Sequence, residues 1–225
     1  MERTVNILYL HGMGGGADSR IPRILKEWYA SHDCGADVRV VCRTYDFDPE
    51  KAASMISAWR EELDPALVIG ESLGSVHAIR LKEIPHILVA PALNGPVFLY
   101  RMAPFMRLWI FRAMAGRKWK VKPGDRQKLV WRRDVLRKYR PHLDEAMRNT
   151  PSGGSRDYFF AFFGERDHYR RQGVVSLGLW EERFGKGSYA LYDGTHFMEE
   201  EYVYSMLIPK ISEVLGLGRD LMENE

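Results

Sequence analysis

Cysteine is scarce in this chain, and the apolar run at its amino terminus is short. The 225 residues include two cysteines, Cys34 and Cys42, which match no metal-binding spacing and can form one disulfide at most. Residues 5–10 form a mostly apolar run, too short for the core of a signal peptide or for a membrane span. These features predict free thiols and a cytoplasmic location.

Acidic residues are scarce in one segment. Between residues 95 and 150 the chain has 15 Lys or Arg and 4 Asp or Glu, although the net charge of the whole chain is +3. The simplest interpretation of this excess is a solvated helix face, and the alternative is a site for an anionic group. No nucleic-acid-binding module or spaced aromatic platform accompanies the charge, so nucleic acid is not an expected partner.

Apolar runs of strand length alternate with helical patterns along most of the chain. With 45% hydrophobic residues, 225 residues are enough to bury one sizeable core. The alternation is typical of βαβ units around a parallel sheet that is buried on both faces. We therefore predict an α/β fold organised as one domain over residues 1–225, with strands at 5–10, 38–43, 67–70, 86–90, 158–163 and 189–192.

Several helices have recognisable starts. Asp18 or Ser19 is placed to cap a helix whose apolar residues follow at helical spacing, and Asp48 is placed to cap a second helix that begins with proline. The last helix is expected after Glu199. Pro209 lies inside its pattern and should kink or restart it, because proline lacks the amide proton of the helical hydrogen bond.

Residues 95–155 interrupt the alternation and contain no convincing strand. Three arginines, Arg101, Arg107 and Arg112, interrupt the apolar residues too often for a membrane span. We expect an insertion of two or three helices that packs over one edge of the sheet as a lid, with 151–155 as a flexible return. Its apolar side chains are expected to pack against the body rather than on a membrane; they are Phe98, Tyr100, Met102, Phe105, Met106, Trp109, Phe111 and Met114.

The pentapeptide Gly70-Glu71-Ser72-Leu73-Gly74 lies between a predicted buried strand and a helical pattern. In this context a G-x-S-x-G sequence is typical of a nucleophile elbow, in which the serine occupies a strained strand-to-helix turn. Glycines flank the serine because larger side chains would collide where the backbone reverses. Ser72 is therefore the candidate nucleophile.

A serine hydroxyl needs an adjacent base, and that base needs an orienting acid. Asp167 follows the strand predicted at 158–163, and His196 follows the strand predicted at 189–192. Loops at the carboxyl ends of parallel strands meet at one edge of the sheet, so both side chains can face Ser72. Glu165 and Asp193 are alternative acids because they lie close to Asp167 and His196 in the sequence.

The order Ser72, Asp167, His196 resembles that of the α/β-hydrolase superfamily, and in particular its small, esterase-like members. The resemblance covers most of residues 5–215 outside the insertion. It implies a minimal sheet of about six parallel strands with helices on both faces. The first strand of this chain would correspond to the third strand of larger relatives.

A glycine-rich run, from His11 to Gly16, directly follows the first predicted strand. Two backbone amides that donate to the developing oxyanion can each lower an acyl-transfer barrier by roughly 3 to 4 kcal/mol. The resemblance implies that these amides belong to Leu73 and Met13, with Gly14 as the alternative to Met13. His11 would then be structural and hold the loop by hydrogen bonds.

The glycine run also permits a rival interpretation. Gly12, Gly14 and Ala17 match a dinucleotide-binding fingerprint, and Arg43 is placed to meet the 2′-phosphate of NADP. That fingerprint opens a helix within the glycines, which would place Pro22 in the helix interior at a cost of about 3 kcal/mol. An NADP-dependent oxidoreductase also leaves the serine, aspartate and histidine without a role.

The pattern as a whole predicts a serine hydrolase that cleaves carboxylic ester or thioester bonds through an acyl-enzyme and needs no cofactor or metal. The expected substrate is a small acyl ester. The basic insertion suggests that this substrate carries an anionic group. The alternative from another class is a non-catalytic protein of the same fold that binds partners through residues 95–150.

Overall fold

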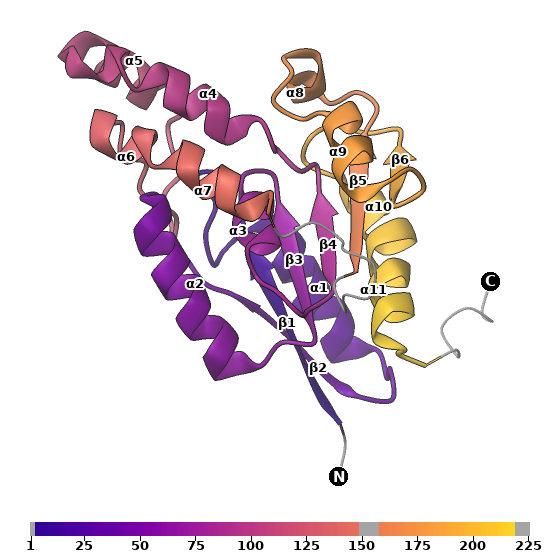
Figure 1. The fold of residues 1–225 in the computed structure, drawn as a ribbon. Coiled ribbons are helices and arrows are strands. Elements are labelled where there is room, and N and C mark those ends of the chain that lie inside the picture. The colour runs from indigo at the N-terminus through magenta and orange to yellow at the C-terminus, as the bar shows by residue number, and fades with distance from the viewer. Residues whose placement is uncertain (1–2, 149–157, 219–225) are drawn as a thin grey trace.

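The chain folds around a single parallel sheet (Figure 1). The computed structural model describes residues 3–148 and 158–218, and the return segment predicted at 151–155 lies outside them. The sheet has the strand order β2-β1-β3-β4-β5-β6, and every adjacent pair is parallel. The strands are β1 Thr4–Leu10, β2 Asp37–Cys42, β3 Leu67–Glu71, β4 His86–Val89, β5 Phe159–Gly164 and β6 Tyr189–Tyr192.

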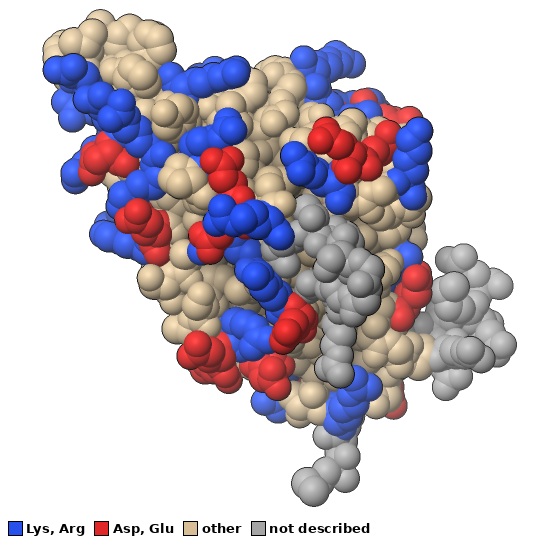
Figure 2. All heavy atoms as spheres, in the orientation of Figure 1, with Lys and Arg blue, Asp and Glu red and all other residues tan. Residues whose placement is uncertain are grey.

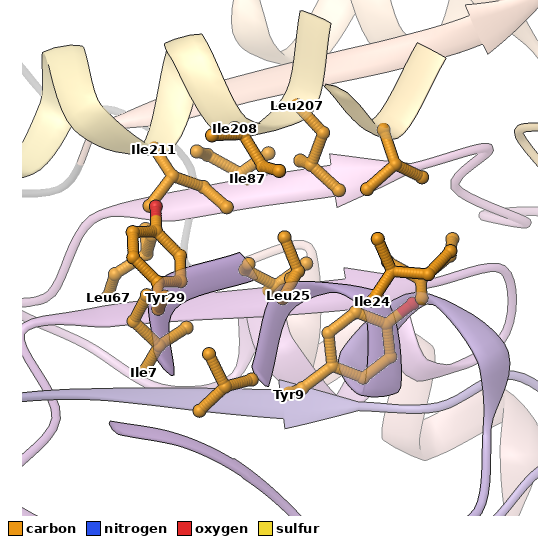
Figure 3. Close-up of a cluster of buried hydrophobic side chains, with 14 of the residues drawn as sticks. Ile7, Tyr9, Ile24, Leu25, Tyr29, Leu67, Ile87, Leu207, Ile208 and Ile211 are labelled. Atoms are coloured by element: carbon orange, nitrogen blue, oxygen red, sulfur yellow. The ribbon is translucent and has the colours of Figure 1, made fainter. Parts of the chain in front are cut away.

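All six predicted strands are confirmed, with ends that differ by one residue at most. The four central strands are almost entirely buried, because helices cover both faces of the sheet. On one face, α1 (Arg20–Ser31) and α11 (Ile208–Leu215) pack against the sheet. Figure 3 shows this layer, in which Ile24 and Leu25 of α1 belong to the same cluster as Ile7 and Tyr9 of β1.

The opposite face of the sheet is covered by α2 (Pro49–Leu63), α3 (Gly74–Ile79) and α9 (Leu177–Phe184). The start of α2 agrees with the prediction, because the Asp48 carboxylate accepts a hydrogen bond from the Glu50 amide. The two buried clusters thus sandwich the sheet. The predicted α/β fold with helices on both faces is confirmed.

The carboxyl-terminal helix is interrupted near its proline, as predicted. A short helix, α10 (Glu200–Tyr202), leads into a π-helical segment, η2 (Val203–Leu207), and α11 begins at Ile208. Pro209 therefore lies in the first turn of α11, where its missing amide proton costs nothing.

Residues 95–148 form the part of the insertion that the structure describes. They contain α4 Gly95–Met102, a 3₁₀ turn η1 Phe105–Arg107, α5 Trp109–Lys118, α6 Arg133–Arg137 and α7 Tyr139–Ala146. The prediction of two or three helices was wrong, because the helical pattern breaks again at Leu108 and at Lys138. That the insertion acts as a lid stays a prediction. Within residues 3–148 and 158–218, no helix is long and apolar enough to cross a membrane.

The expected packing of the apolar run is wrong for five of its eight side chains. Met106 is buried in a cluster with Leu73 and Leu99, so part of the run does pack against the body. Phe98, Tyr100, Phe105, Trp109 and Met114 are exposed. Phe105, Trp109 and Met114 are exposed because η1 and α5 extend away from the sheet at one end of the molecule, as Figure 1 shows.

Buried histidines join the insertion to the body. His142 of α7 and His77 of α3 share a hydrogen bond of 2.9 Å between Nε2 and Nδ1. His77 lies edge-on to Tyr45, and the ring of His11 stacks on the ring of the same tyrosine, with 4.1 Å between the ring centroids. Burial lowers the pKa of both His11 and His142 to about 4.

We expect the free energy of unfolding to fall as the pH drops from about 6.5 toward 4. Histidine in the unfolded chain has a pKa near 6.5, whereas the buried rings of His11 and His142 have a pKa of about 4. Between these two pH values the unfolded chain therefore binds protons that the folded chain does not bind, which favours unfolding. Each ring should contribute roughly 3 kcal/mol to this loss, and its full contribution is present above pH 6.5. Urea denaturation at several pH values measures the effect.

Two variants test the cause of this acid sensitivity. His142→Gln removes one titrating ring and should flatten the pH dependence of the unfolding free energy. His32→Gln removes an exposed histidine and should keep the wild-type dependence. An unaltered pH dependence in His142→Gln would contradict the prediction.

Candidate active site

Ser72 lies in the sharp turn between β3 and α3, with a positive φ of 51°. A non-glycine residue in this region is strained, and such strain is typical of a nucleophile elbow. Gly70 is required because a Cβ there would lie 2.7 Å from the Cα of Ser75. A Cβ on Gly74 would collide with the backbone oxygen of Leu10. The local sequence therefore permits β3, the turn and α3 to pack closely behind Ser72.

The structure brings Ser72, His196 and Asp167 into one hydrogen-bonded chain. Nε2 of His196 lies 2.8 Å from Oγ of Ser72, and Nδ1 of His196 lies 2.8 Å from Oδ2 of Asp167. Because the carboxylate can only accept, Nδ1 carries the proton and Nε2 accepts from the serine hydroxyl. This tautomer is the one that a general base for Ser72 requires.

Asp167 is almost completely buried in the loop after β5, where it also caps α8 (His168–Arg171). Its Oδ1 accepts a hydrogen bond of 2.7 Å from the amide of Tyr169. Burial acts to raise the pKa of this carboxyl, but the hydrogen bonds from His196 and Tyr169 outweigh burial, so the pKa lies below its ordinary value. The carboxylate is therefore ionised at neutral pH.

The two alternative acids lie elsewhere. Asp193 is exposed and forms an ion pair with Arg166, with 3.1 Å between Nε and Oδ1. Glu165 is also exposed. Of the three carboxylates considered from the sequence, Asp167 is the one that contacts His196.

The loop that carries His196 is held from two sides. Arg20, at the start of α1, donates hydrogen bonds to the backbone oxygens of Phe197 and Met198, the second at 2.7 Å. The Glu199 carboxylate accepts from the amide of Thr195 at 3.0 Å. These contacts limit the positions that the imidazole can occupy. The sequence did not indicate this role for Arg20 or Glu199, although Glu199 lies three positions after His196.

The glycine loop after β1 presents its amides near the elbow. A Cβ on Gly12 would lie 3.1 Å from that of Ser72, so the loop passes directly beside the serine. The amide of Gly14 donates to Oε1 of Gln127 at 3.1 Å and is therefore already engaged. Within the part of the chain that the structure describes, the amides of Met13 and Leu73 have no hydrogen-bond partner. This arrangement favours Met13 over Gly14 as an oxyanion donor.

Gln127 ties the insertion to the glycine loop. Its side-chain amide donates to the backbone oxygen of Asp46 at 3.2 Å, and its own backbone amide donates to the oxygen of Gly15 at 2.7 Å. The side chain is 2% exposed. Sequence reasoning missed Gln127, because a lone glutamine in a basic segment carries no signal of this contact.

Solved structures with the same arrangement of elements place this chain in a known fold. A monoacylglycerol lipase from Paleococcus ferrophilus is 15% identical over 96% of each chain, with a TM-score of 0.61. Mouse alpha/beta hydrolase domain-containing protein 10 is 15% identical over 96% of this chain and 91% of its own, with a TM-score of 0.64. The chain has the α/β-hydrolase fold.

A third similar structure, Est1E from Butyrivibrio proteoclasticus, was solved with ferulic acid bound. It is 12% identical over 94% of this chain and 91% of its own, with a TM-score of 0.57. No protein-family model matches the sequence, and no curated protein is significantly similar to it. The structural matches nevertheless confirm the resemblance to α/β-hydrolases that the sequence shows.

The α/β-hydrolase fold disagrees with the dinucleotide-binding interpretation. Helix α1 begins at Arg20, beyond the glycine run, so the glycines do not open it, and Pro22 lies in its first turn. Arg43 forms a two-pronged ion pair with Glu62 at 2.5 and 2.6 Å. This pairing leaves Arg43 poorly suited to bind a phosphate.

His11 contacts its own loop in this α/β-hydrolase fold. Nδ1 of His11 lies 2.8 Å from the backbone oxygen of Gly12, and the backbone oxygen of His11 accepts from the Tyr45 hydroxyl.

No group of three or more His, Cys, Asp or Glu side chains is arranged to hold a metal ion within residues 3–148 and 158–218.

Proposed function

We propose that this protein is a serine hydrolase that cleaves carboxylic ester or thioester bonds. The observation that carries the proposal is the continuous hydrogen-bonded chain from Oγ of Ser72 through His196 to Asp167. A nucleophile, a base in the required tautomer and a buried ionised acid are the components that acyl transfer needs.

In the proposed reaction, Oγ of Ser72 attacks the substrate carbonyl carbon while Nε2 of His196 takes its proton. The amides of Met13 and Leu73 would donate to the oxygen that becomes negatively charged. The imidazolium, stabilised by Asp167, then protonates the leaving alcohol or thiol, and an acyl-Ser72 ester remains. Water activated by His196 attacks this ester, which releases the carboxylic acid and restores the hydroxyl of Ser72.

The surroundings of the elbow support an acyl substrate. Leu73 and Met13 belong to a cluster in which the insertion supplies mostly apolar side chains, including Leu99 and Phe111. Met13 and Phe111 are only partly buried, and such apolar side chains would suit an acyl or aromatic group next to a carbonyl. The ferulic acid bound to Est1E and the lipase name of the Paleococcus structure agree with this choice. That the substrate also carries an anionic group stays a prediction from the charge of the insertion.

Covalent labelling tests the proposed function. A fluorophosphonate probe should modify the folded protein once per chain, and peptide mapping should place the adduct on Ser72. The same preparation should hydrolyse short p-nitrophenyl esters. A folded protein that takes up no probe would contradict the proposal and would favour a binding role for this fold.

Gln127 should matter for turnover, since it fixes the loop that carries Met13. Gln127→Ala removes the acceptor for the Gly14 amide and should lower kcat about tenfold with little change in KM, because a shifted donor weakens transition-state binding. Gln127→Glu keeps an acceptor for Gly14 but loses the donor to Asp46, and we expect an intermediate kcat. Steady-state kinetics with a p-nitrophenyl ester measures both.

The control for this prediction is Gln172→Ala, which removes an exposed glutamine. It should leave kcat unchanged. Equal losses in Gln172→Ala and Gln127→Ala would refute a specific effect on the glycine loop.

A further inference from the structure

Five large apolar side chains are exposed within ten consecutive residues of the insertion. Phe105 is 56% exposed, Leu108 58%, Trp109 72%, Ile110 49% and Met114 57%. They lie on η1, the residue after it, and α5. We call residues 105–118 the tip. A concentration of exposed apolar groups of this kind marks an interaction surface rather than ordinary scatter.

The tip is anchored to the region around Ser72 by buried side chains. Met106, Ala115 and Phe111 turn inward and pack in the cluster that also contains Leu73. Because the inward side chains have their own core, the outward ones are not left exposed by poor packing. The exposed side chains are thus presented on a supported surface.

Along the sequence, the charged residues within and next to the tip are all basic. The chain has no Asp or Glu from residue 84 to residue 124. In the same stretch it has seven basic residues, which are Arg101, Arg107, Arg112, Arg117, Lys118, Lys120 and Lys122. Among the ion pairs of residues 3–148 and 158–218, none includes these seven. Figure 2 shows the basic side chains gathered over α4 and α5, beside an uncharged protrusion.

We propose that the tip docks on the surface of an anionic lipid bilayer. Trp109 and its apolar neighbours would enter the boundary between headgroups and acyl chains, where indole rings are favoured. The surrounding Arg and Lys side chains would lie among negatively charged headgroups, each adding about fivefold to the partition coefficient. The inference stands apart from the proposed hydrolase activity.

A bilayer accounts for both features better than a folded protein partner does. Seven cations spread along 22 residues need many negative charges at no fixed positions, which a fluid anionic surface offers. The exposed apolar side chains can insert into the apolar part of a bilayer without a pocket of matching shape. A segment that combines exposed aromatic, apolar and basic side chains is suited to lie at the boundary between headgroups and acyl chains.

Vesicle co-sedimentation tests the proposal. In about 0.1 M NaCl the wild-type protein should bind phosphatidylcholine vesicles that contain about 30 mol% phosphatidylserine at least tenfold more tightly than pure phosphatidylcholine vesicles. Trp109→Ala/Ile110→Ala should lower the partition coefficient about tenfold. Arg107→Gln/Arg112→Gln should lower it about 25-fold, because each charge contributes about fivefold, and about 0.5 M NaCl should weaken wild-type binding.

Matched controls separate the tip from the rest of the surface. Met55→Ala/Leu191→Ala removes two exposed apolar side chains elsewhere, and Lys82→Gln/Lys186→Gln removes two exposed charges elsewhere. Both should bind vesicles like the wild type. Thermal melts by circular dichroism show whether each variant is folded.

Three outcomes would overturn the proposal. They are wild-type binding that is absent or indifferent to phosphatidylserine, tip variants that bind as well as the controls, and self-association of the protein that the Trp109→Ala/Ile110→Ala pair abolishes. The last would assign the tip to a second copy of the chain. Because Ser72→Ala should bind vesicles normally, failure of docking and failure of the hydrolase proposal are distinguishable.

Discussion

Ser72→Ala should take up no fluorophosphonate probe and should hydrolyse p-nitrophenyl esters with a kcat at least about a thousandfold below wild type. The substitution removes the oxygen that bonds to the carbonyl carbon, so no acyl-enzyme can form, and the remaining rate comes from binding and oxyanion stabilisation alone. KM should change little, because the hydroxyl contributes little to ground-state binding.

The fold should tolerate this change. Alanine keeps the Cβ that already occupies the strained turn, so Ser72→Ala should unfold near the wild-type temperature. Ser54→Ala, on the exposed side of α2, is the control and should keep full labelling and turnover. Labelling of Ser72→Ala at the wild-type rate would move the nucleophile to another residue.

Asp167→Asn should lower kcat by roughly 10³- to 10⁴-fold while the protein stays folded. The asparagine amide can donate to Nδ1 of His196, which places the imidazole proton on Nε2 and removes the acceptor for the Ser72 hydroxyl. The loss should appear in kcat rather than in KM, since the change acts on the proton transfer.

Asp193→Asn is the matched control for the acid. It neutralises an exposed carboxylate that pairs with Arg166 and should keep activity within about twofold, because an exposed ion pair contributes little. A large loss in Asp193→Asn with retained activity in Asp167→Asn would reverse the assignment of the orienting acid.

Much of the sheet could be predicted because its strands are buried on both faces. The runs at β1, β3 and β5 are mostly apolar, and turn or polar residues mark their ends within one position. The order of the strands could not be read from these runs, since one apolar strand can pair with any other. The insertion was harder to divide, because its helices are short and because η1 and α5 expose apolar side chains as well as burying them.

The candidate site was predictable where one residue type has a special requirement. A nucleophile elbow needs small residues beside a strained serine, so the sequence pattern alone indicates Gly70, Ser72 and Gly74. Gln127 and Arg20 could not be found in this way. Their contacts join positions more than 100 residues apart, and ordinary polar side chains carry no record of such distant partners.

The order of the strands has a consequence for the growing chain. From β4 to β6, each strand lies beside the one synthesised before it, so the sheet can extend from β3 at a single edge as the ribosome releases the polypeptide. The Ser72 turn, between β3 and α3, can assemble early in translation. His196 follows β6 and joins last, so the nascent polypeptide should remain inert until its final strand is in place.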